Sequence, residues 1–325
     1  MGRILHGLTS LILVFAVSGC AALAADDQDT GGGSKAASGS KVARAKPTPE
    51  PTKPPLRVAD LLGSDGRLTV LILGSDEREG VIGARTDAII VATIDPVSGK
   101  VAMVSLPRDT VSVPIAPGVA YPGRINALFW EYERKLGKTK PALKRVKQEL
   151  AYAFGTEIDY YAMVEFDGLV RLVNSIGGID VTLEEKFVDK SMHLGEKGLK
   201  LKAGKRQFDG KRALAYSRSR HTSTDYDRSR RQQQVLTASA AKVRRRGADR
   251  LAGLVDVARS KIVTDMPYRA APALLELAAT ADLEKVKSVV LEPGRYAREL
   301  PGTYTITLRV LETQKLFDRL FKPVE

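Results

Sequence analysis

Short apolar runs separated by turn-forming residues dominate the middle of this chain. Residues 68–73, 87–94 and 100–106 are almost continuously apolar, which is typical of strands that are buried on both faces of a sheet. The last two runs flank Asp95-Pro96-Val97-Ser98-Gly99, where several residues favour turns. This pattern predicts a hairpin with a longer loop.

Helical periodicity alternates with further strand patterns downstream. The apolar residues of 140–154 recur on one helical face, which predicts an amphipathic helix. Further strands are expected at 160–166, 179–183, 288–291 and 304–310, and further helices at 167–176, 251–263, 270–281 and 311–321, with an exposed loop at 184–204. Interleaved helices and strands with one hairpin favour an α/β domain, in which helices cover both faces of a mixed central sheet.

The most unusual chemistry lies in residues 216–234, YSRSRHTSTDYDRSRRQQQ. Planar guanidinium groups suit a multiply charged oxyanion such as a diphosphate, but an isolated run of this kind is also typical of a solvated basic helix face. The run places five arginines around two carboxylates: Arg218, Arg220, Arg228, Arg230 and Arg231 around Asp225 and Asp227.

A helix is predicted to start within this run. Asp225 could be its N-cap, because a short acceptor side chain can accept a hydrogen bond from a backbone N–H of the first turn. Helical spacing would then bring Arg228, either Arg231 or Gln232, and Val235 onto one face. Arg230 would lie on a different face and is expected to be solvated.

Composition narrows the possible partners. The 325 residues carry a net charge of +13, which favours nucleic acid, phosphorylated substrates or an anionic membrane surface. The single cysteine excludes an internal disulfide, and three histidines argue against a His-based zinc site or a Ser-His-Asp triad. The basic run holds two tyrosines but no series of aromatic residues interleaved with its arginines in the manner of a nucleic-acid surface. With the export signal described next, this makes nucleic acid an unexpected partner.

The N-terminus has the pattern of an export signal. Arg3 is followed by the apolar segment 8–17, and residues 17–20, Val-Ser-Gly-Cys, resemble a lipobox. We therefore expect a signal peptide at 1–19 and a lipidated Cys20 that tethers the protein to the membrane outside the cytoplasm. An uncleaved signal anchor is the alternative. Residues 20–56 are rich in Gly, Ser, Ala, Lys, Pro and Thr and are predicted to be a disordered linker, with the folded domain at 57–325.

Polar clusters recur at the ends of the predicted strands. Any one of them could be a solvated sheet edge, but several together suggest one site. The clusters are Asp76 with Arg78, Arg85 with Asp87, Arg108 with Asp109, and Arg124 with Asn126. Arginines there would neutralise a diphosphate, and carboxylates would hold Mg²⁺ or act as a general base.

Six stretches together make the sequence resemble the LytR–CpsA–Psr family of bacterial cell-envelope proteins over residues 68–243. They are VLILGSD (70–76), ARTDAIIVATIDP (84–96), VSLPRDT (104–110), GRINALF (123–129), IDYYAMVEFDGLVRLVNSIGGIDV (158–181) and LAYSRSR…DYDRSRRQQ (214–233). The resemblance implies a three-layer α/β/α fold with a mixed sheet and an apolar pocket for a polyprenyl chain. It also implies a phosphotransferase that moves a glycopolymer from a polyprenyl diphosphate to peptidoglycan through a phosphodiester bond.

The family's functional residues carry over by motif. The resemblance implies an Mg²⁺ site at Asp76 and Asp87, and a catalytic role for Arg108, Asp109 and Asp225, with the base left open among Asp87, Asp109 and Asp225. It implies diphosphate contacts from Arg85, Arg124, Arg218, Arg220, Arg228, Arg231 and Gln232. Arg124 replaces a lysine common in the family, Asp227 replaces a small residue, and the apparent lipid anchor replaces a spanning helix. A lipid pyrophosphatase and a non-catalytic binder of such lipids or of anionic wall polymers are the alternatives.

Overall fold

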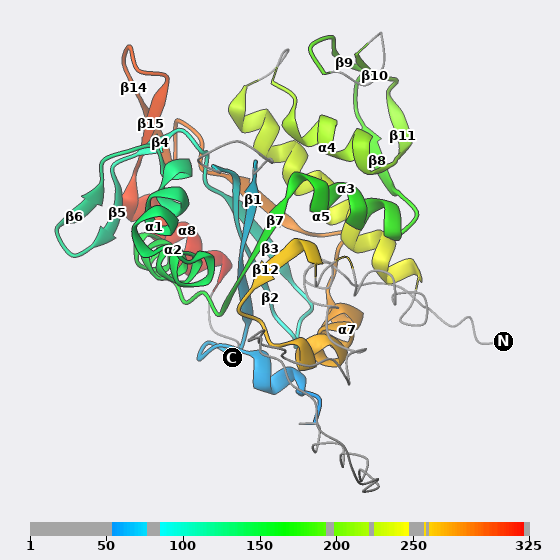
Figure 1. Ribbon diagram of the computed structural model, residues 1–325, viewed down its shortest axis with the longest axis horizontal. Helices are drawn as coiled ribbons and strands as arrows, with labels where there is room; N and C mark the ends of the chain where they lie inside the picture. The colour runs from blue at the N-terminus through cyan, green and yellow to red at the C-terminus, as the bar shows by residue number, and fades with distance from the viewer. Residues whose placement is uncertain are drawn as a thin grey trace, which may run out of the picture.

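A mixed sheet in the order β12-β7-β1-β2-β3-β13 forms the centre of the computed structural model (Figure 1). Its strands are β1 (Leu68–Ser75), β2 (Thr86–Ile94), β3 (Val101–Ser105), β7 (Tyr160–Glu165), β12 (Ile262–Thr264) and β13 (Lys287–Val290). β1 pairs antiparallel with β2 and parallel with β7, while β3 pairs antiparallel with β2 and parallel with β13. The predicted mixed sheet is confirmed.

The structure describes residues 54–76, 85–192, 198–220, 224–246, 257 and 260–321. The predicted signal peptide (1–19), Cys20 and nearly all of the predicted linker (20–56) lie outside these ranges. Within them, no helix combines the length and apolar character that crossing a bilayer requires.

The turn between β2 and β3 forms for the reason that its sequence suggests. The Asp95 carboxylate accepts hydrogen bonds from the backbone N–H groups of Val97 and Ser98 at 2.9 and 3.1 Å. Gly99 has a φ of 69°, a conformation that glycine adopts without steric cost. The predicted hairpin is therefore confirmed, and it fixes the register that aligns the start of β2 with the end of β3.

Helices cover both faces of the sheet (Figure 1). One layer consists of α1 (Leu128–Leu136), α2 (Thr139–Phe154) and α8 (Val310–Leu320); the other consists of α3 (Phe166–Ser175), α4 (Gly210–Arg218), α5 (Asp225–Arg246) and α7 (Ala271–Thr280). Alternate residues of β1 feed the two cores: Leu71 packs with the first layer and Ile72 with the second. The three-layer α/β/α arrangement is thus confirmed, and burial on both faces explains the unbroken apolar runs.

Short strands and 3-10 helices lie around the central sheet and its helices. They are β4 (Thr110–Val111), β5 (Val113–Ala116), β6 (Val119–Tyr121), β8 (Ile179–Leu183), β9 (Phe187–Asp189), β10 (Leu199–Leu201), β11 (Gly204–Phe208), β14 (Ala297–Leu300), β15 (Thr305–Leu308), η2 (Val58–Leu61), η3 (Ile125–Ala127) and η5 (Tyr268–Ala270). The C-terminal part extends the sheet through β13 and adds β15 beside β4.

Two predicted elements differ from the structure. The exposed loop expected at 184–204 contains the antiparallel pair β9–β10, and Asp189 within it is fully buried. The helix expected at 251–263 is too long: residues 257, 260 and 261 are helical, but Ile262 and Val263 belong to β12, which pairs antiparallel with β7, and β-branched residues fit a strand better than a helix. Most of the remainder of that predicted helix lies outside the described residues.

Candidate active site

Four strands bring the predicted polar residues to one edge of the sheet. β1 and β7 run parallel and end there. β2 starts at this edge because it is antiparallel to β1, and β3 ends there because it is antiparallel to β2. Asp87, near the start of β2, and Arg108, shortly after β3, therefore become neighbours, as the sequence pattern predicts.

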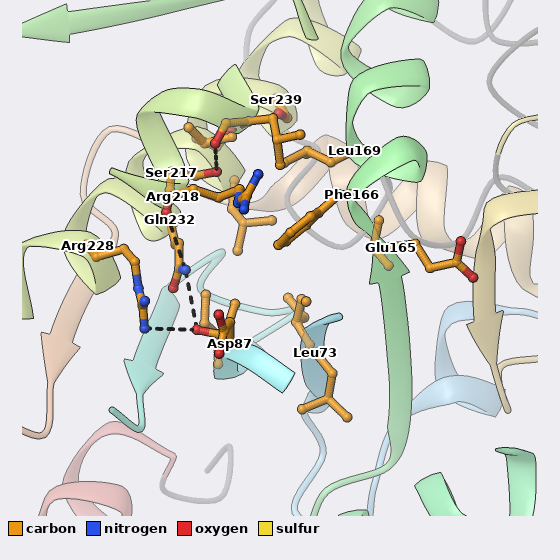
Figure 2. A pocket seen from close by; sticks show the side chains of 18 of the residues that line it. Leu73, Asp87, Glu165, Phe166, Leu169, Ser217, Arg218, Arg228, Gln232 and Ser239 are labelled. Carbon is orange, nitrogen blue, oxygen red and sulfur yellow. Dashed lines mark hydrogen bonds between the residues drawn. The ribbon is translucent and has the colours of Figure 1, made fainter. Parts of the chain in front are cut away.

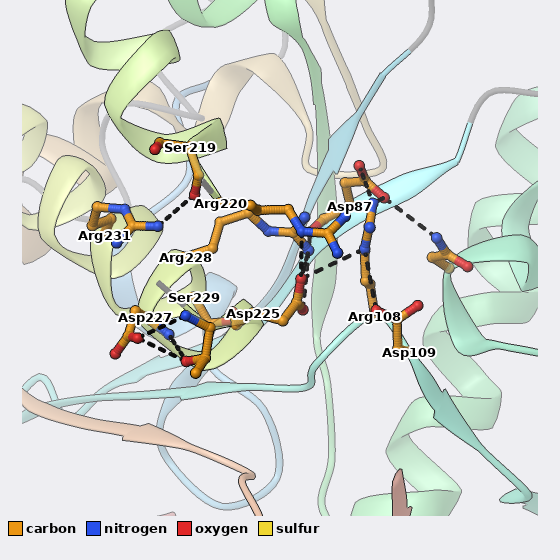
Figure 3. Close-up of polar contacts among 12 residues, drawn as sticks. Asp87, Arg108, Asp109, Ser219, Arg220, Asp225, Asp227, Arg228, Ser229 and Arg231 are labelled. Carbon is orange, nitrogen blue, oxygen red and sulfur yellow. Dashed lines mark hydrogen bonds and ion pairs between the residues drawn. The ribbon is translucent and has the colours of Figure 1, made fainter. Parts of the chain in front are cut away.

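Asp87 and Arg108 form the centre of a charged cluster (Figure 3). Arg108 Nη1 donates to Oδ1 and Oδ2 of Asp87 at 2.9 and 2.8 Å. Asn126 Nδ2 donates to Oδ1 of the same carboxylate at 3.3 Å. Asp109 is bound by Arg124, whose Nη1 lies 2.8 Å from Asp109 Oδ1. The strand-end pairs thus form one network.

Asp225 joins this network from the first turn of α5. Its Oδ1 lies 2.9 Å from Arg228 Nη2, and 3.7 Å from the Nε atoms of both Arg108 and Arg220. Within the part of the chain that the structure describes, three buried atoms of the cluster make ion-pair contacts at most and no hydrogen bond of suitable geometry: Arg108 Nε, Arg228 Nε and Asp225 Oδ1. Buried polar groups normally find partners, so this unused capacity is typical of a site that binds a polar ligand.

Burial and charge act against each other at this cluster. Desolvation raises the pKa of Asp225, although Arg228 and Arg108 oppose it. Desolvation also lowers the pKa of Arg228, against the effect of Asp225. For Arg108, burial lowers the pKa, but Asp87, Asp109 and Asp225 outweigh it and leave the pKa raised.

A pocket of about 240 Å³ opens beside the cluster (Figure 2). Its charged and polar lining includes Asp87, Arg108, Arg218, Arg220, Arg228 and Gln232. Its apolar lining comes from β1, β2, β7 and helices α3, α4 and α5, and consists of Ile72, Leu73, Ala88, Ile90, Val164, Phe166, Leu169, Leu172, Leu214, Val235 and Leu236. The cavity is therefore amphipathic, with an arginine-rich part and an apolar part.

Helix α5 lines this pocket with a stripe at helical spacing. Arg228, Gln232, Val235, Leu236 and Ser239 all face the cavity. Arg228 Nη2 and Gln232 Nε2 both donate to the Asp87 carbonyl oxygen, at 3.4 and 3.5 Å (Figure 2). The alternative that the sequence left open, Arg231 or Gln232, is resolved in favour of Gln232.

Arg230 and Arg231 lie on other faces of α5, where both line a separate open groove. Arg231 is buried and donates from Nε to the carbonyl oxygen of Tyr216 at 3.0 Å. Arg230 is about half exposed and forms ion pairs with Asp227 and Glu292. The predicted diphosphate contact Arg231 is therefore absent from the described lining of the pocket, and the expectation that Arg230 lies on a different face is met.

The start of α5 is capped by a different residue from the one predicted. Thr224 Oγ1 accepts from the Asp227 backbone N–H at 3.2 Å, and Asp227 Oδ2 accepts from the Thr224 backbone N–H at 2.9 Å. This reciprocal pair is a capping box. Asp225 is the first helical residue rather than the N-cap, so its carboxylate can face the arginines while Asp227 serves the helix.

The remaining predicted residues lie around the cluster. Arg218 stacks its guanidinium over the Phe166 ring at 4.3 Å. Asp76 Oδ1 accepts from the Arg85 backbone N–H at 2.7 Å, and neither side chain belongs to the described pocket lining. Phe166 and Ser217 also line the pocket and were missed, although Phe166 directly follows a predicted strand in the same way as the charged clusters.

The protein side chains at this site could supply only some of the ligands that Mg²⁺ requires. Among the described residues, no three His, Cys, Asp or Glu side chains are grouped so that they could hold a metal ion. Mg²⁺ commonly takes one or two carboxylates together with substrate phosphates and water. Asp87 Oδ2 accepts one hydrogen bond and has a second lone-pair position, so Asp87, with Asp76 at the same sheet edge, fits that donor set.

Comparison with known proteins identifies the family. The model of the LytR_cpsA_psr family matches residues 31–321. This chain belongs to that family. The resemblance seen over residues 68–243 is confirmed, and the family match extends beyond it on both sides.

Several family relatives are similar to this chain. Regulatory protein MsrR of Staphylococcus aureus is 31% identical over 63% of this chain and 58% of its own length. The polyisoprenyl-teichoic acid–peptidoglycan teichoic acid transferase TagV of Bacillus subtilis is 35% identical over 47% of this chain and 38% of its own length. The matched part of this chain thus spans less than two thirds of either relative.

The solved structures agree with the fold. The crystal structure of B. subtilis TagV superposes with a TM-score of 0.62 at 24% identity and covers 79% of this chain and 97% of its own. TagT bound to LI-WTA superposes with a TM-score of 0.58 at 25% identity, covering 78% and 89%. Both support the three-layer architecture.

Proposed function

We propose that this protein is a phosphotransferase that moves a glycopolymer from a polyprenyl diphosphate carrier to peptidoglycan, and forms a phosphodiester bond. One observation carries the proposal: an apolar pocket opens directly beside a cluster of arginines and aspartates. An isoprenoid diphosphate has the same two parts, an apolar chain and a multiply charged head group. The names of the relatives point the same way, since TagV is a teichoic acid transferase and TagT has been solved bound to LI-WTA, a wall teichoic acid ligand.

In this proposal the pocket holds the start of the isoprenoid chain. Ile72, Ile90, Leu169, Leu172 and Leu236 supply apolar surface, which favours burial of a hydrocarbon chain by about 25 cal/mol per Å² removed from water. The diphosphate then lies against the arginine-rich part of the cavity. Arg218, Arg220 and Arg228 offer guanidinium N–H groups there, and the Nε atoms of Arg108 and Arg228, which make no hydrogen bond within the described residues, add further donors.

The reaction requires positioning and charge neutralisation more than covalent chemistry by the protein. A sugar hydroxyl of peptidoglycan attacks the phosphorus attached to the glycopolymer, the bond from that phosphorus to the bridging oxygen breaks, and polyprenyl phosphate leaves. Arg108 and Arg228 stabilise the negative charge that develops on the phosphoryl oxygens. When bound at Asp87 and Asp76, Mg²⁺ would supply further neutralisation of the diphosphate.

A carboxylate accepts the proton of the attacking hydroxyl. Among Asp87, Asp109 and Asp225, we favour Asp225 as this base. Both Asp87 oxygens accept hydrogen bonds from Arg108, whereas Asp225 Oδ1 is held by an ion pair with Arg228 at 2.9 Å and accepts no hydrogen bond of suitable geometry from the described residues. Burial also raises the pKa of Asp225, which makes its carboxylate a better proton acceptor near neutral pH.

The proposal places the protein outside the cytoplasm, where peptidoglycan lies. The lipidated Cys20 would keep the domain at the membrane surface, and the segment that follows would let it reach the head group of a lipid-linked donor. Labelling of the full chain with a radioactive fatty acid, lost in Cys20→Ala, tests this anchor. Retention of the label in that variant would contradict it.

A transfer assay tests the activity. The full-length chain in detergent would be given a polyprenyl-diphosphate-linked oligosaccharide, Mg²⁺ and peptidoglycan fragments, and the phosphodiester product would be measured by mass spectrometry. Product that is lost in Asp87→Ala supports the proposal. Release of phosphate without a peptidoglycan adduct would indicate a lipid pyrophosphatase, and lipid binding without turnover would indicate a non-catalytic binder.

A further inference from the structure

Ser219 lies between two arginines that line the pocket, yet it faces the other way. Arg218 and Arg220 line the cavity, and Ser219 is fully buried outside the described lining. Its backbone has a φ of −57° and a ψ of 138°, close to polyproline II, in which neighbouring side chains point in different directions. Fixing the Ser219 backbone therefore constrains the backbone from which Arg218 and Arg220 project.

Two buried groups hold Ser219 in place. Its carbonyl oxygen accepts from Arg231 Nη2 (Figure 3), and its hydroxyl donates to Asp189 Oδ2. Its own N–H donates to the Ala215 carbonyl oxygen at 3.0 Å and ends α4. The hydroxyl, the carbonyl and the N–H of Ser219 are thus all bound to fixed partners.

Strand β9 supplies one side of this anchor. Phe187 and Asp189 are two residues apart on β9, so both point to the same side of the strand. The Phe187 ring lies 5.2 Å from the Arg231 guanidinium, and Asp189 binds Ser219. Arg231 also lies 5.8 Å from the Tyr216 ring and donates to the Tyr216 carbonyl oxygen.

We infer that Arg231 and Asp189 are positioning residues, which hold Ser219 so that Arg218 and Arg220 are presented to the diphosphate. Arg231 acts through those two arginines and does not contact the phosphate itself. The contacts of the Arg231 guanidinium support this. It donates to two backbone carbonyl oxygens at the end of α4, and it lies near two aromatic rings. The inference rests on the proposed function, since it assigns the diphosphate to Arg218 and Arg220.

A double-mutant cycle tests the inference. Binding of farnesyl diphosphate with Mg²⁺ to the full chain would be measured by calorimetry for the wild type, Arg231→Lys, Arg218→Ala/Arg220→Ala and the triple variant. Lysine keeps the charge but cannot bridge two carbonyls. We expect Arg231→Lys to weaken binding about tenfold in the wild-type background and less than about twofold in the double-variant background. The reason is that the effects of substitutions on binding free energy do not add when the residues act through the same contacts.

Arg230→Lys is the matched control, because Arg230 is the adjacent arginine of α5 and pairs with Asp227 and Glu292 outside the pocket; we expect less than about a twofold change. Ser219→Ala is a second variant that loses the bond to Asp189 and should reproduce the coupling if Arg231→Lys folds poorly.

Three results would contradict either the positioning role of Arg231 or the proposed function. A tenfold loss in both backgrounds would make Arg231 a direct phosphate ligand. Unchanged affinity of the folded fraction, with only a lower melting temperature, would make the anchor purely structural. Failure of the wild type to bind farnesyl diphosphate would instead remove the proposed function, on which this inference depends.

Discussion

A partly buried aspartate lies near each end of β1, and the two aspartates have neighbours of opposite charge. At the end of the strand, Asp225 lies among Arg108, Arg220 and Arg228. At its start, about 20 Å away by strand rise, the Asp159 carboxylate accepts from the Thr69 backbone N–H at 2.7 Å.

The neighbours of Asp159 are mostly acidic. The pKa of Asp159 is raised to about 7, chiefly by desolvation; Glu157 and Asp65 add to this increase, and the Thr69 N–H and Lys147 oppose it. Desolvation raises the pKa of Asp225 as well, but the arginines offset part of that effect.

Burial alone therefore does not identify a functional carboxylate in this fold; the neighbouring charges do. The arginine-rich end can accept an anion, because it adds guanidinium donors with unused hydrogen-bonding capacity. The acidic end would repel an anion and should affect folding only. The following predictions test this difference, from the largest expected effect to the smallest.

Arg108→Ala should lower the transfer rate by about 10³-fold, because Arg108 joins Asp87, Asp109 and Asp225 in one network and its loss removes a preorganised donor. Steady-state transfer kinetics with the lipid-linked donor would measure the effect. A far-ultraviolet circular dichroism spectrum like that of the wild type is the control for folding. A loss below about tenfold would show that the network is not the catalytic centre.

Asp225→Asn should lower transfer by about 10²-fold or more, the usual contribution of a general base. A base works in its ionised form, so activity is lost as pH falls through its pKa. Burial raises that pKa, so the acid limb of kcat/KM in the wild type should lie above the pH expected of an exposed aspartate. The limb should disappear from the residual activity of the variant; an unchanged limb would assign the base elsewhere.

Leu236→Trp should fill part of the pocket and weaken binding of a long polyprenyl diphosphate by about tenfold, because hydrocarbon contacts are lost. Affinity for inorganic pyrophosphate should stay within about twofold, since the arginines are untouched. Leu311→Trp is the matched control, because Leu311 is 72% exposed on α8. Equal losses for both ligands would mean that the cavity does not hold the hydrocarbon.

Asp159→Asn should leave transfer unchanged and stabilise the protein at alkaline pH. The folded-state pKa of about 7 exceeds the unfolded value of about 3.9. The folded state therefore binds more protons between these values, and stability falls as pH rises towards 7. Thermal unfolding should show a gain of about 1–3 kcal/mol at pH 8 relative to pH 4 for the variant, after allowance for partial exposure. An equal gain at both pH values would reject the ionisation argument.

Local sequence determined much of this protein. The apolar runs of β1, β2 and β3, the Asp95–Gly99 turn and the helical stripe through Arg228 and Val235 could all be predicted, because each depends on periodicity or on the conformational preference of a few residues. The strand-end position of Asp87, Arg108 and Asp109 followed from the same pattern, and so did the expectation that they meet.

Only the tertiary structure decided which side chains face the pocket and which distant segments meet, because residue spacing does not determine either. Neighbouring helix positions differ by about 100°, so the sequence could place either Arg231 or Gln232 in the pocket; packing of Phe187 and Tyr216 around Arg231 turned it away. The polar segment 184–204 looked like a loop because its anchors, Phe187 and Asp189, gain their partners from distant α4 and α5. Asp227 rather than Asp225 pairs with Thr224 at the start of α5, which leaves Asp225 to face the arginines. Its approach to Arg108 joins distant parts of the chain, so residue type alone does not predict it.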